Sequence, residues 1–266
     1  MTFNADGLAG ILQQAGHDIV LPAFRTASET ARKSDGSVVT ATDLACQSFI
    51  EGELHKLEPD TAFLSEEMSE AAQHDCLASS GGRYWCLDPL DGTTNFVAGI
   101  PVFGISLALI EHGLPRFACI HDPVRQETFV AEAGRGAELN GRKLRADRLL
   151  PLDHAVGYID FKRLPTDTAA LLSTHRLYRS QRNIGSCALE WAWLAAGRGD
   201  FIVHGSEKIW DFAAGALLAT EAGCSVGDFA GEPIFPADGL TSPILATSSP
   251  QLEQALRPLL APGYEG

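Results

Sequence analysis

Residues 88–96 read Asp88-Pro89-Leu90-Asp91-Gly92-Thr93-Thr94-Asn95-Phe96, and no other segment of this 266-residue chain carries as much information. Two carboxylates stand three positions apart around a proline, directly after the apolar run 84–87, which predicts a buried strand. Gly92 and the polar residues that follow it favour a turn and the start of a helix. Two anionic side chains at the end of a strand require a cation, and the segment contains no Lys or Arg. A hard divalent cation such as Mg²⁺ is therefore the expected partner.

An isolated Asp-x-x-Asp pair also has an ordinary explanation, because Asp-Pro and Asp-Gly are common turn dipeptides. Further acids at comparable places strengthen the metal interpretation. Glu66 and Glu67 follow a predicted strand at 61–64, and Asp211 stands at the start of a predicted helix. Taken singly, the Glu pair suits a solvated loop, and Asp211 suits a helix N-cap. Together with Asp43 they form a set of scattered carboxylates of the kind that octahedral Mg²⁺ sites use.

The segment after the two aspartates predicts a place for an anion. A helix that begins at Gly92-Thr93 directs free backbone N–H groups and the positive end of its dipole toward a bound anion. Pro89 and Leu90 bring the two carboxylates to one point, with the Leu90 carbonyl between them. Two metals about 3.5–4 Å apart can clamp a phosphate and activate water. The sequence therefore predicts a phosphate-ester site in which the Thr93 hydroxyl holds the attacking water.

Composition and charge exclude several other classes of protein. The chain has 20 basic and 34 acidic residues and a formal net charge of −14, which argues against nucleic-acid binding and against docking on anionic membranes. Its 6 cysteines include no CxxC pair, and their scatter favours a reducing compartment, here the cytoplasm. We expect neither a signal peptide nor a membrane span, because no suitable apolar run is present.

The periodicity of apolar residues predicts an α+β chain in one compact unit. An N-terminal α+β part, residues 1–145, comprises a helix kinked at Pro22, a helix over 42–57 capped by Thr42 or Asp43, and an antiparallel meander at 103–131. A C-terminal α/β part, residues 146–266, alternates strands with helices at 166–173, 186–196, 211–222 and 250–260. The two parts are expected to share one active-site cleft, with most metal ligands on the first part and Asp211 on the second.

Several motifs, taken in order, resemble the inositol monophosphatase family of lithium-sensitive, Mg²⁺-dependent phosphatases. The resemblance spans nearly the whole chain, and its two longer motifs are highly specific. The motifs are Val39-Thr40-Ala41-Thr42-Asp43, Leu64-Ser65-Glu66-Glu67, the segment 88–96, and Trp210-Asp211-Phe212-Ala213-Ala214-Gly215 through Glu221-Ala222-Gly223.

The resemblance implies a layered αβαβα fold, a homodimer and two or three Mg²⁺ ions in each site. It also implies roles for individual residues. The metal ligands would be Glu66, Asp88, the Leu90 carbonyl, Asp91 and Asp211, with Glu67 beside them. Water activation would involve Glu66, Lys33, Asp43 and Thr93. Substrate contacts would come from Gly92, Thr93, Gly185, Ser186, His204 and Asp211.

One departure from the family pattern concerns the substrate. Seven residues before Asp211 the inositol-phosphate enzymes usually have a glutamate that binds a ring hydroxyl, and this chain has His204, with Glu207 three residues further on. The expected reaction is hydrolysis of a small phosphate monoester, most like inositol monophosphate, by metal-activated water. Histidinol phosphate, fructose 1,6-bisphosphate and 3′-phosphoadenosine 5′-phosphate are the alternative substrates. A metal-binding regulatory or interaction protein is the alternative class.

Overall fold

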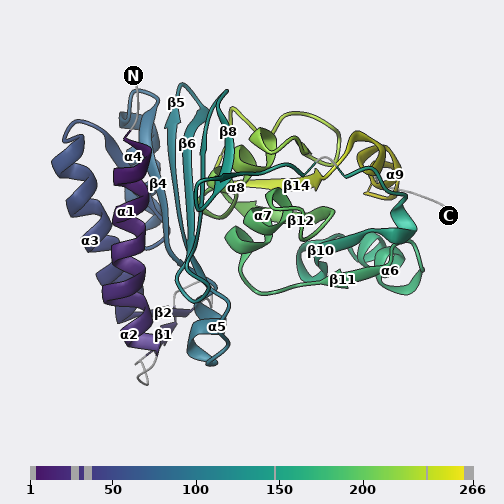
Figure 1. The fold of residues 1–266 in the computed structure, drawn as a ribbon, viewed down its shortest axis with the longest axis horizontal. Helices are drawn as coiled ribbons and strands as arrows, with labels where there is room; N and C mark the ends of the chain where they lie inside the picture. The colour runs from purple at the N-terminus through teal and green to yellow at the C-terminus, as the bar shows by residue number, and fades with distance from the viewer. Residues whose placement is uncertain (1–3, 25–29, 33–37, 147, 238, 261–266) are drawn as a thin grey trace.

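The computed structural model describes residues 4–24, 30–32, 38–146, 148–237 and 239–260. Five layers follow one another across the molecule: helices, a sheet, helices, a second sheet and helices (Figure 1). The predicted αβαβα arrangement is confirmed. Among the described helices, none has both the length and the apolar character needed to cross a membrane.

The first layer consists of N-terminal helices that cover one face of the larger sheet (Figure 1). Helix α1 (Ala5–Ala15) continues through a π-helical turn, η1 (Gly16–Val20), into α2 (Leu21–Phe24). The widened turn ends just before Pro22, which has no N–H for a regular helical bond. Helix α3 (Ala41–Leu57) lies beside α1, and the buried residues of both pack on the sheet.

The second layer is a seven-stranded sheet in the order β3-β4-β5-β6-β7-β8-β9. Its first two strands are parallel and all other neighbours are antiparallel, which confirms the predicted meander and extends it by two short strands. The strands are β3 (Ala62–Ser65), β4 (Arg83–Asp91), β5 (Gly104–Glu111), β6 (Leu114–Asp122), β7 (Glu127–Glu132), β8 (Gly136–Leu139) and β9 (Arg142–Lys143).

Helix α4 (Glu70–Ser79) makes the crossover between β3 and β4, and it is absent from the sequence prediction. A parallel strand pair needs such a connection. Gln73 is the only side chain of this helix that is fully buried, so the helix has no apolar stripe by which sequence analysis would find it. The domain boundary predicted at residue 145 falls between β9 and the next strand, and it stays a prediction.

The third layer is formed by α7 (Cys187–Ala195) and α8 (Ile209–Glu221), whose side chains are buried on nearly all sides. A helix that is apolar all round belongs inside a protein, and these two lie between the sheets (Figure 1). The fourth layer is a five-stranded sheet in the order β11-β10-β12-β14-β13. Its strands are β10 (Val156–Asp160), β11 (Ser180–Arg182), β12 (Phe201–Lys208), β13 (Ser225–Gly227) and β14 (Thr241–Thr247).

Helices α6 (Thr166–Thr174) and α9 (Pro250–Leu260) form the fifth layer and pack on the outer face of this second sheet. The remaining elements are short. They are β1 (Thr30–Arg32), β2 (Val38–Thr40), α5 (Thr93–Val97) and the 3₁₀ turns η2 (Leu152–His154) and η3 (Phe161–Arg163).

The close packing of the two central helices gives a prediction about stability. A Cβ atom at Gly215 would lie 2.2 Å from Cβ of Trp191, so Gly215→Ala forces α7 and α8 apart. We expect this substitution to lower the free energy of unfolding by about 1–3 kcal/mol, measured by urea denaturation. Gly52→Ala in α3 is the matched control, because a Cβ there meets no described atom within 4 Å. The control is expected to be neutral or stabilising, and equal stabilities of the two variants would contradict the packing argument.

Candidate active site

The carboxylates that the sequence singled out lie at the carboxyl edge of two parallel strands. Strands β3 and β4 pair with Ser65 opposite Leu87, so Glu66 and Asp88 follow that pair at the same edge of the sheet. The Glu66 amide donates a hydrogen bond of 3.2 Å to the Leu87 carbonyl. Beyond Asp88 the pairing with β5 shifts register, as expected where a proline removes a donor from the ladder.

Helix α8 supplies the third carboxylate of this group from a distant part of the chain. Ser106 on β5 donates a hydrogen bond of 3.2 Å to the Trp210 carbonyl and so fixes the first turn of α8 against the sheet. One oxygen from each of Glu66, Asp88 and Asp211 then lies within 4.8 Å of the other two. The structure therefore brings together three of the residues that the sequence identified as metal ligands.

The electrostatics of this group favour a bound cation. Burial raises the pKa of Asp88 and of Asp211 well above the ordinary carboxyl range, and repulsion from Glu66 and Asp91 raises each further. Asp88 is 2% exposed, whereas Glu66 and Asp211 are half-buried and leave the group open on one side. Three converging carboxylates in a partly desolvated site match the hard oxygen donors that Mg²⁺ takes. The donor set therefore fits a divalent metal.

Asp91 lies next to this group but is held by a different helix. Its carboxylate accepts hydrogen bonds from the Ser186 hydroxyl, from the Cys187 amide at 3.2 Å and from the Ala188 amide at 2.9 Å. These are donors at the N-terminus of α7, so Asp91 ties the end of β4 to that helix. Burial still raises the pKa of Asp91 above its usual range. Asp91 lies close enough to the group to raise the pKa of Asp88.

The predicted water-activating residues are also close together. Thr93 Oγ1 lies 3.1 Å from Asp43 Oδ1 and 2.9 Å from the Leu90 carbonyl oxygen, so its one hydrogen is donated to one of the two. Asp43 is buried, which raises its pKa, and its Oδ2 accepts the Thr40 amide at 2.8 Å. Lys33 lies outside the described residues.

The helix cap expected at Thr42 or Asp43 is corrected by this arrangement. Thr40 is the N-cap of α3, and Asp43 completes a capping box as the third residue of the helix. The prediction was wrong because the strand at 38–40 ends directly at the helix. The first helical residue is therefore Ala41, and the side chain of Thr40 accepts a hydrogen bond from a backbone amide of the first helical turn, at Thr42.

Two glycine segments named as substrate contacts lie side by side. Gly92 and Gly185 have φ values of +91° and +75°, which other residues rarely adopt. A Cβ at Gly92 would lie 3.2 Å from the Gly185 carbonyl oxygen. Asn95 joins the two segments, donating hydrogen bonds of 2.8 Å to the Val102 carbonyl and 2.7 Å to that of Ile184. Gly92, Gly185 and Ser186 therefore form one rim around Asp91.

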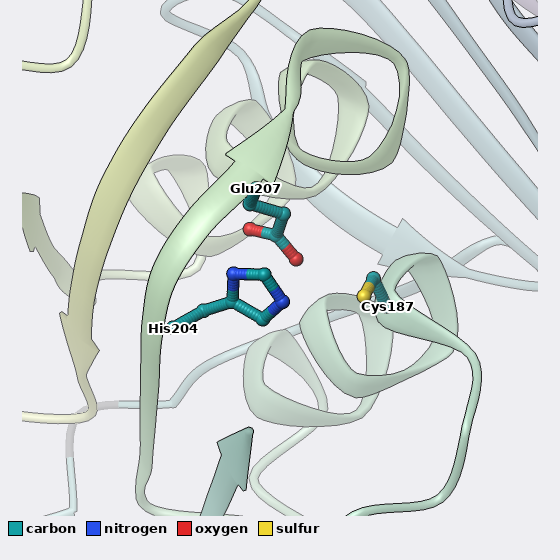
Figure 2. Close-up of side chains that lie close together, drawn as sticks. All are labelled: Cys187, His204 and Glu207. Atoms are coloured by element: carbon teal, nitrogen blue, oxygen red, sulfur yellow. The ribbon is translucent and has the colours of Figure 1, made fainter. Parts of the chain in front are cut away.

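His204 is buried on β12 and lies in a second group of side chains. Its Nε2 lies 3.4 Å from Asp160 Oδ2, and the imidazole faces Glu207 and Cys187 (Figure 2). In a regular strand His204 and Glu207 would point to opposite faces, since they are three residues apart. A register shift between these two residues, in the pairing of β12 with β14, turns them toward the same side.

Sequence analysis missed several polar residues around this second group. Glu190 is 7% exposed and accepts the Ile184 amide at 2.8 Å, and its burial raises its pKa to about 8. Cys187 and Asp160 also escaped notice. The signal for Glu190 was a single acid in an otherwise apolar helix. Nothing in the sequence shows the strand irregularity that turns His204 and Glu207 toward the same side.

Comparison with known proteins agrees with this geometry. Residues 7–262 match the sequence profile of the inositol monophosphatase family. A Thermotoga maritima protein named fructose-1,6-bisphosphatase/inositol-1-monophosphatase is 35% identical over 227 residues, covering 84% of this chain and 83% of that protein. The Escherichia coli K12 protein named Nus factor SuhB is 37% identical over 211 residues, covering 77% of each chain.

Solved structures show the same fold. A Thermotoga maritima IMPase superimposes with a TM-score of 0.84 at 30% identity and covers 96% of this chain and 95% of its own. An IMPase/NADP phosphatase, solved in complex with NADP and Ca²⁺, has a TM-score of 0.83 at 26% identity and covers 97% of this chain and 95% of its own. The predicted family and fold are confirmed, and a divalent metal is supported.

The buried acids give a prediction about pH. In the presence of a chelator, we expect the free energy of unfolding to fall as the pH rises from about 4 to about 8. Glu190 has its pKa raised to about 8 in the folded state, compared with about 4 in an unfolded chain. The folded protein therefore keeps a proton that the unfolded chain has released, and this stabilisation is lost as the pH rises through the folded-state pKa.

Urea denaturation at a series of pH values measures this slope. Glu190→Gln removes one of the titrating groups and keeps an acceptor for the Ile184 amide, so its slope should be shallower than that of the unmodified chain. A stability that is flat or rises over the same interval would contradict the prediction.

Proposed function

This chain belongs to the inositol monophosphatase family, and from that membership we propose that it is a Mg²⁺-dependent hydrolase of small phosphate monoesters. The observation that carries the proposal is the convergence of Glu66, Asp88 and Asp211, with ligand oxygens within 4.8 Å of one another. These residues would hold the metal, with Asp91 and the Leu90 carbonyl beside them, and we propose two or three ions. Bound Mg²⁺ neutralises such a group, polarises phosphoryl oxygens and lowers the pKa of water.

We assign the positioning of the attacking water to Thr93 and Asp43. The Thr93 hydroxyl lies within hydrogen-bond reach of Asp43, so it can accept a proton from water while its own proton passes to the carboxylate. The raised pKa of Asp43, caused by its burial, suits a group that receives a proton. Glu66, at the edge of the metal group, would also help to activate the attacking water. The reaction is direct attack on phosphorus, since nothing in the mechanism requires a covalent intermediate.

We assign the phosphate and the alcohol to two neighbouring sets of residues on the rim around Asp91. The backbone amides of Gly92 and Thr93 would receive the phosphate. Gly185, Ser186 and His204, together with Asp211, would face the alcohol that leaves. The Asn95 side chain joins these two segments, because its amide donates hydrogen bonds to the carbonyls of Val102 and Ile184.

The substrate that we favour is a monophosphate of the inositol type. The names of the relatives widen the range to fructose 1,6-bisphosphate and NADP, and histidinol phosphate and 3′-phosphoadenosine 5′-phosphate complete the set to be tested. Where other family members have a glutamate, which can only accept hydrogen bonds, this chain has His204, whose imidazole can also donate. The hydrogen bonds made to the alcohol group of the substrate will therefore differ.

We also propose a cytoplasmic homodimer; the six free cysteines, all in the described part, support a reducing compartment.

A second candidate is a metal-binding interaction protein. The relatives named Nus factor SuhB favour it. The complete set of acids favours the enzyme, because buried carboxylates with no cation to bind would be a cost to folding. Metal-dependent turnover of any monoester distinguishes the two candidates.

The decisive assay measures phosphate release from this panel of esters with Mg²⁺ and with a chelator. We expect Mg²⁺-dependent release, reduced at least about 100-fold by Asp88→Asn and by Asp211→Asn, because each removes one charge from the metal group. Glu127→Gln is the control, since Glu127 forms an ion pair with Arg198 on another part of the molecule and should leave the rate unchanged. Release that persists in both aspartate variants would refute the metal assignment, and no release from any ester would favour the interaction protein.

A further inference from the structure

A second group of potential metal ligands lies between the central helices and the smaller sheet. The Cys187 sulfur, a ring nitrogen of His204 and a carboxylate oxygen of Glu207 all lie within 4.8 Å of one another. Figure 2 shows the Glu207 carboxylate, the His204 imidazole and the Cys187 sulfur converging on one point from three sides. None of these residues belongs to the group of Glu66, Asp88 and Asp211.

The donor atoms differ in kind from those of the carboxylate group. Sulfur, imidazole nitrogen and carboxylate oxygen together form a ligand set that Zn²⁺ and related transition metals bind. Mg²⁺ takes oxygen donors and has little affinity for a thiolate. The two groups would therefore select different metals even though both lie near Asp91 and Asp211.

The three side chains are held in place by the fold. Cys187 is the first residue of α7, whose N-terminus is fixed by Asp91. Trp191, one turn further on, donates a hydrogen bond of 3.0 Å to Glu207 Oε2. His204 has a partner at each ring nitrogen: Asp160 lies 3.4 Å from its Nε2, and the Ser206 amide donates a hydrogen bond of 3.3 Å to its Nδ1, so a bound metal takes the place of one of them. Carboxylates and donors around the ligands commonly orient them in metal sites.

Several buried acids surround these three side chains. Glu190 and Glu207 are 7% and 1% exposed, and both act on Cys187 together with Asp91 and Asp211. Arg163 also acts on Glu207, and the Arg163 Nε already lies 3.5 Å from Asp160. A divalent cation would offset this charge where the side chains already converge.

We propose that Cys187, His204 and Glu207 form a transition-metal site of the zinc type beside the carboxylate group. Three protein ligands leave a fourth position open, as in zinc sites that bind a further ligand. Cys187 is half-buried as a residue, whereas the other two ligands are buried. On binding, the thiol proton of Cys187 passes to solvent and the metal takes its place on sulfur.

Cobalt provides a test that does not depend on phosphatase activity. Co²⁺ is added to the full chain in the presence of excess Mg²⁺, which fills the all-oxygen group, and the absorption spectrum is recorded. A thiolate-to-cobalt charge-transfer band in the near ultraviolet, reaching a plateau at one ion per chain, is the expected result. Zn²⁺ added afterwards should displace the cobalt and remove the band.

Four variants locate the band. Cys187→Ser should lose it, and His204→Gln should weaken Co²⁺ binding at least about 10-fold. Cys76→Ser should keep it, because Cys76 is a half-buried thiol on α4 and outside the site. Asp88→Asn should also keep it, which separates this site from the proposed phosphatase centre. Absence of a thiolate band in the unmodified chain, or a band that survives Cys187→Ser, would overturn the proposal.

Discussion

Mutual repulsion among converging carboxylates is the constraint on which the structure depends. Glu66, Asp88 and Asp211 come from three separate elements, and burial together with like charge makes Asp88 and Asp211 harder to ionise. A fold that forces such groups together needs either protons or a cation at that point. The same cost that makes the arrangement unfavourable without metal makes it selective for a small, highly charged ion.

The layered architecture serves to hold these groups in place. Parallel pairing of β3 with β4 places Glu66 and Asp88 at one edge, and the buried helix α8 carries Asp211 to them from the second half of the chain. Asp91 also has a structural role. By accepting the donors at the start of α7 it links the two halves, and the rim formed by Gly92, Gly185 and Ser186 follows from that link.

Much of this was predictable from the sequence because the signals are local. The order of strands and helices, the turn at 88–96 and the acids at strand ends all follow from patterns a few residues long. What was missed depends on contacts between distant segments. Helix α4 has no apolar stripe. The carboxylate of Asp91 accepts hydrogen bonds from the first residues of α7, 96 and 97 positions further along the chain. The grouping of His204 with Glu207 depends on an irregular strand, which no spacing rule shows.

Crystals grown with Mn²⁺ in place of Mg²⁺ test the central claim most directly, because manganese is located by its anomalous scattering. The account predicts at least one manganese peak within bonding distance of carboxylate oxygens from Glu66, Asp88 and Asp211 together. A structure in which these side chains point apart, or in which manganese binds only elsewhere, would contradict it.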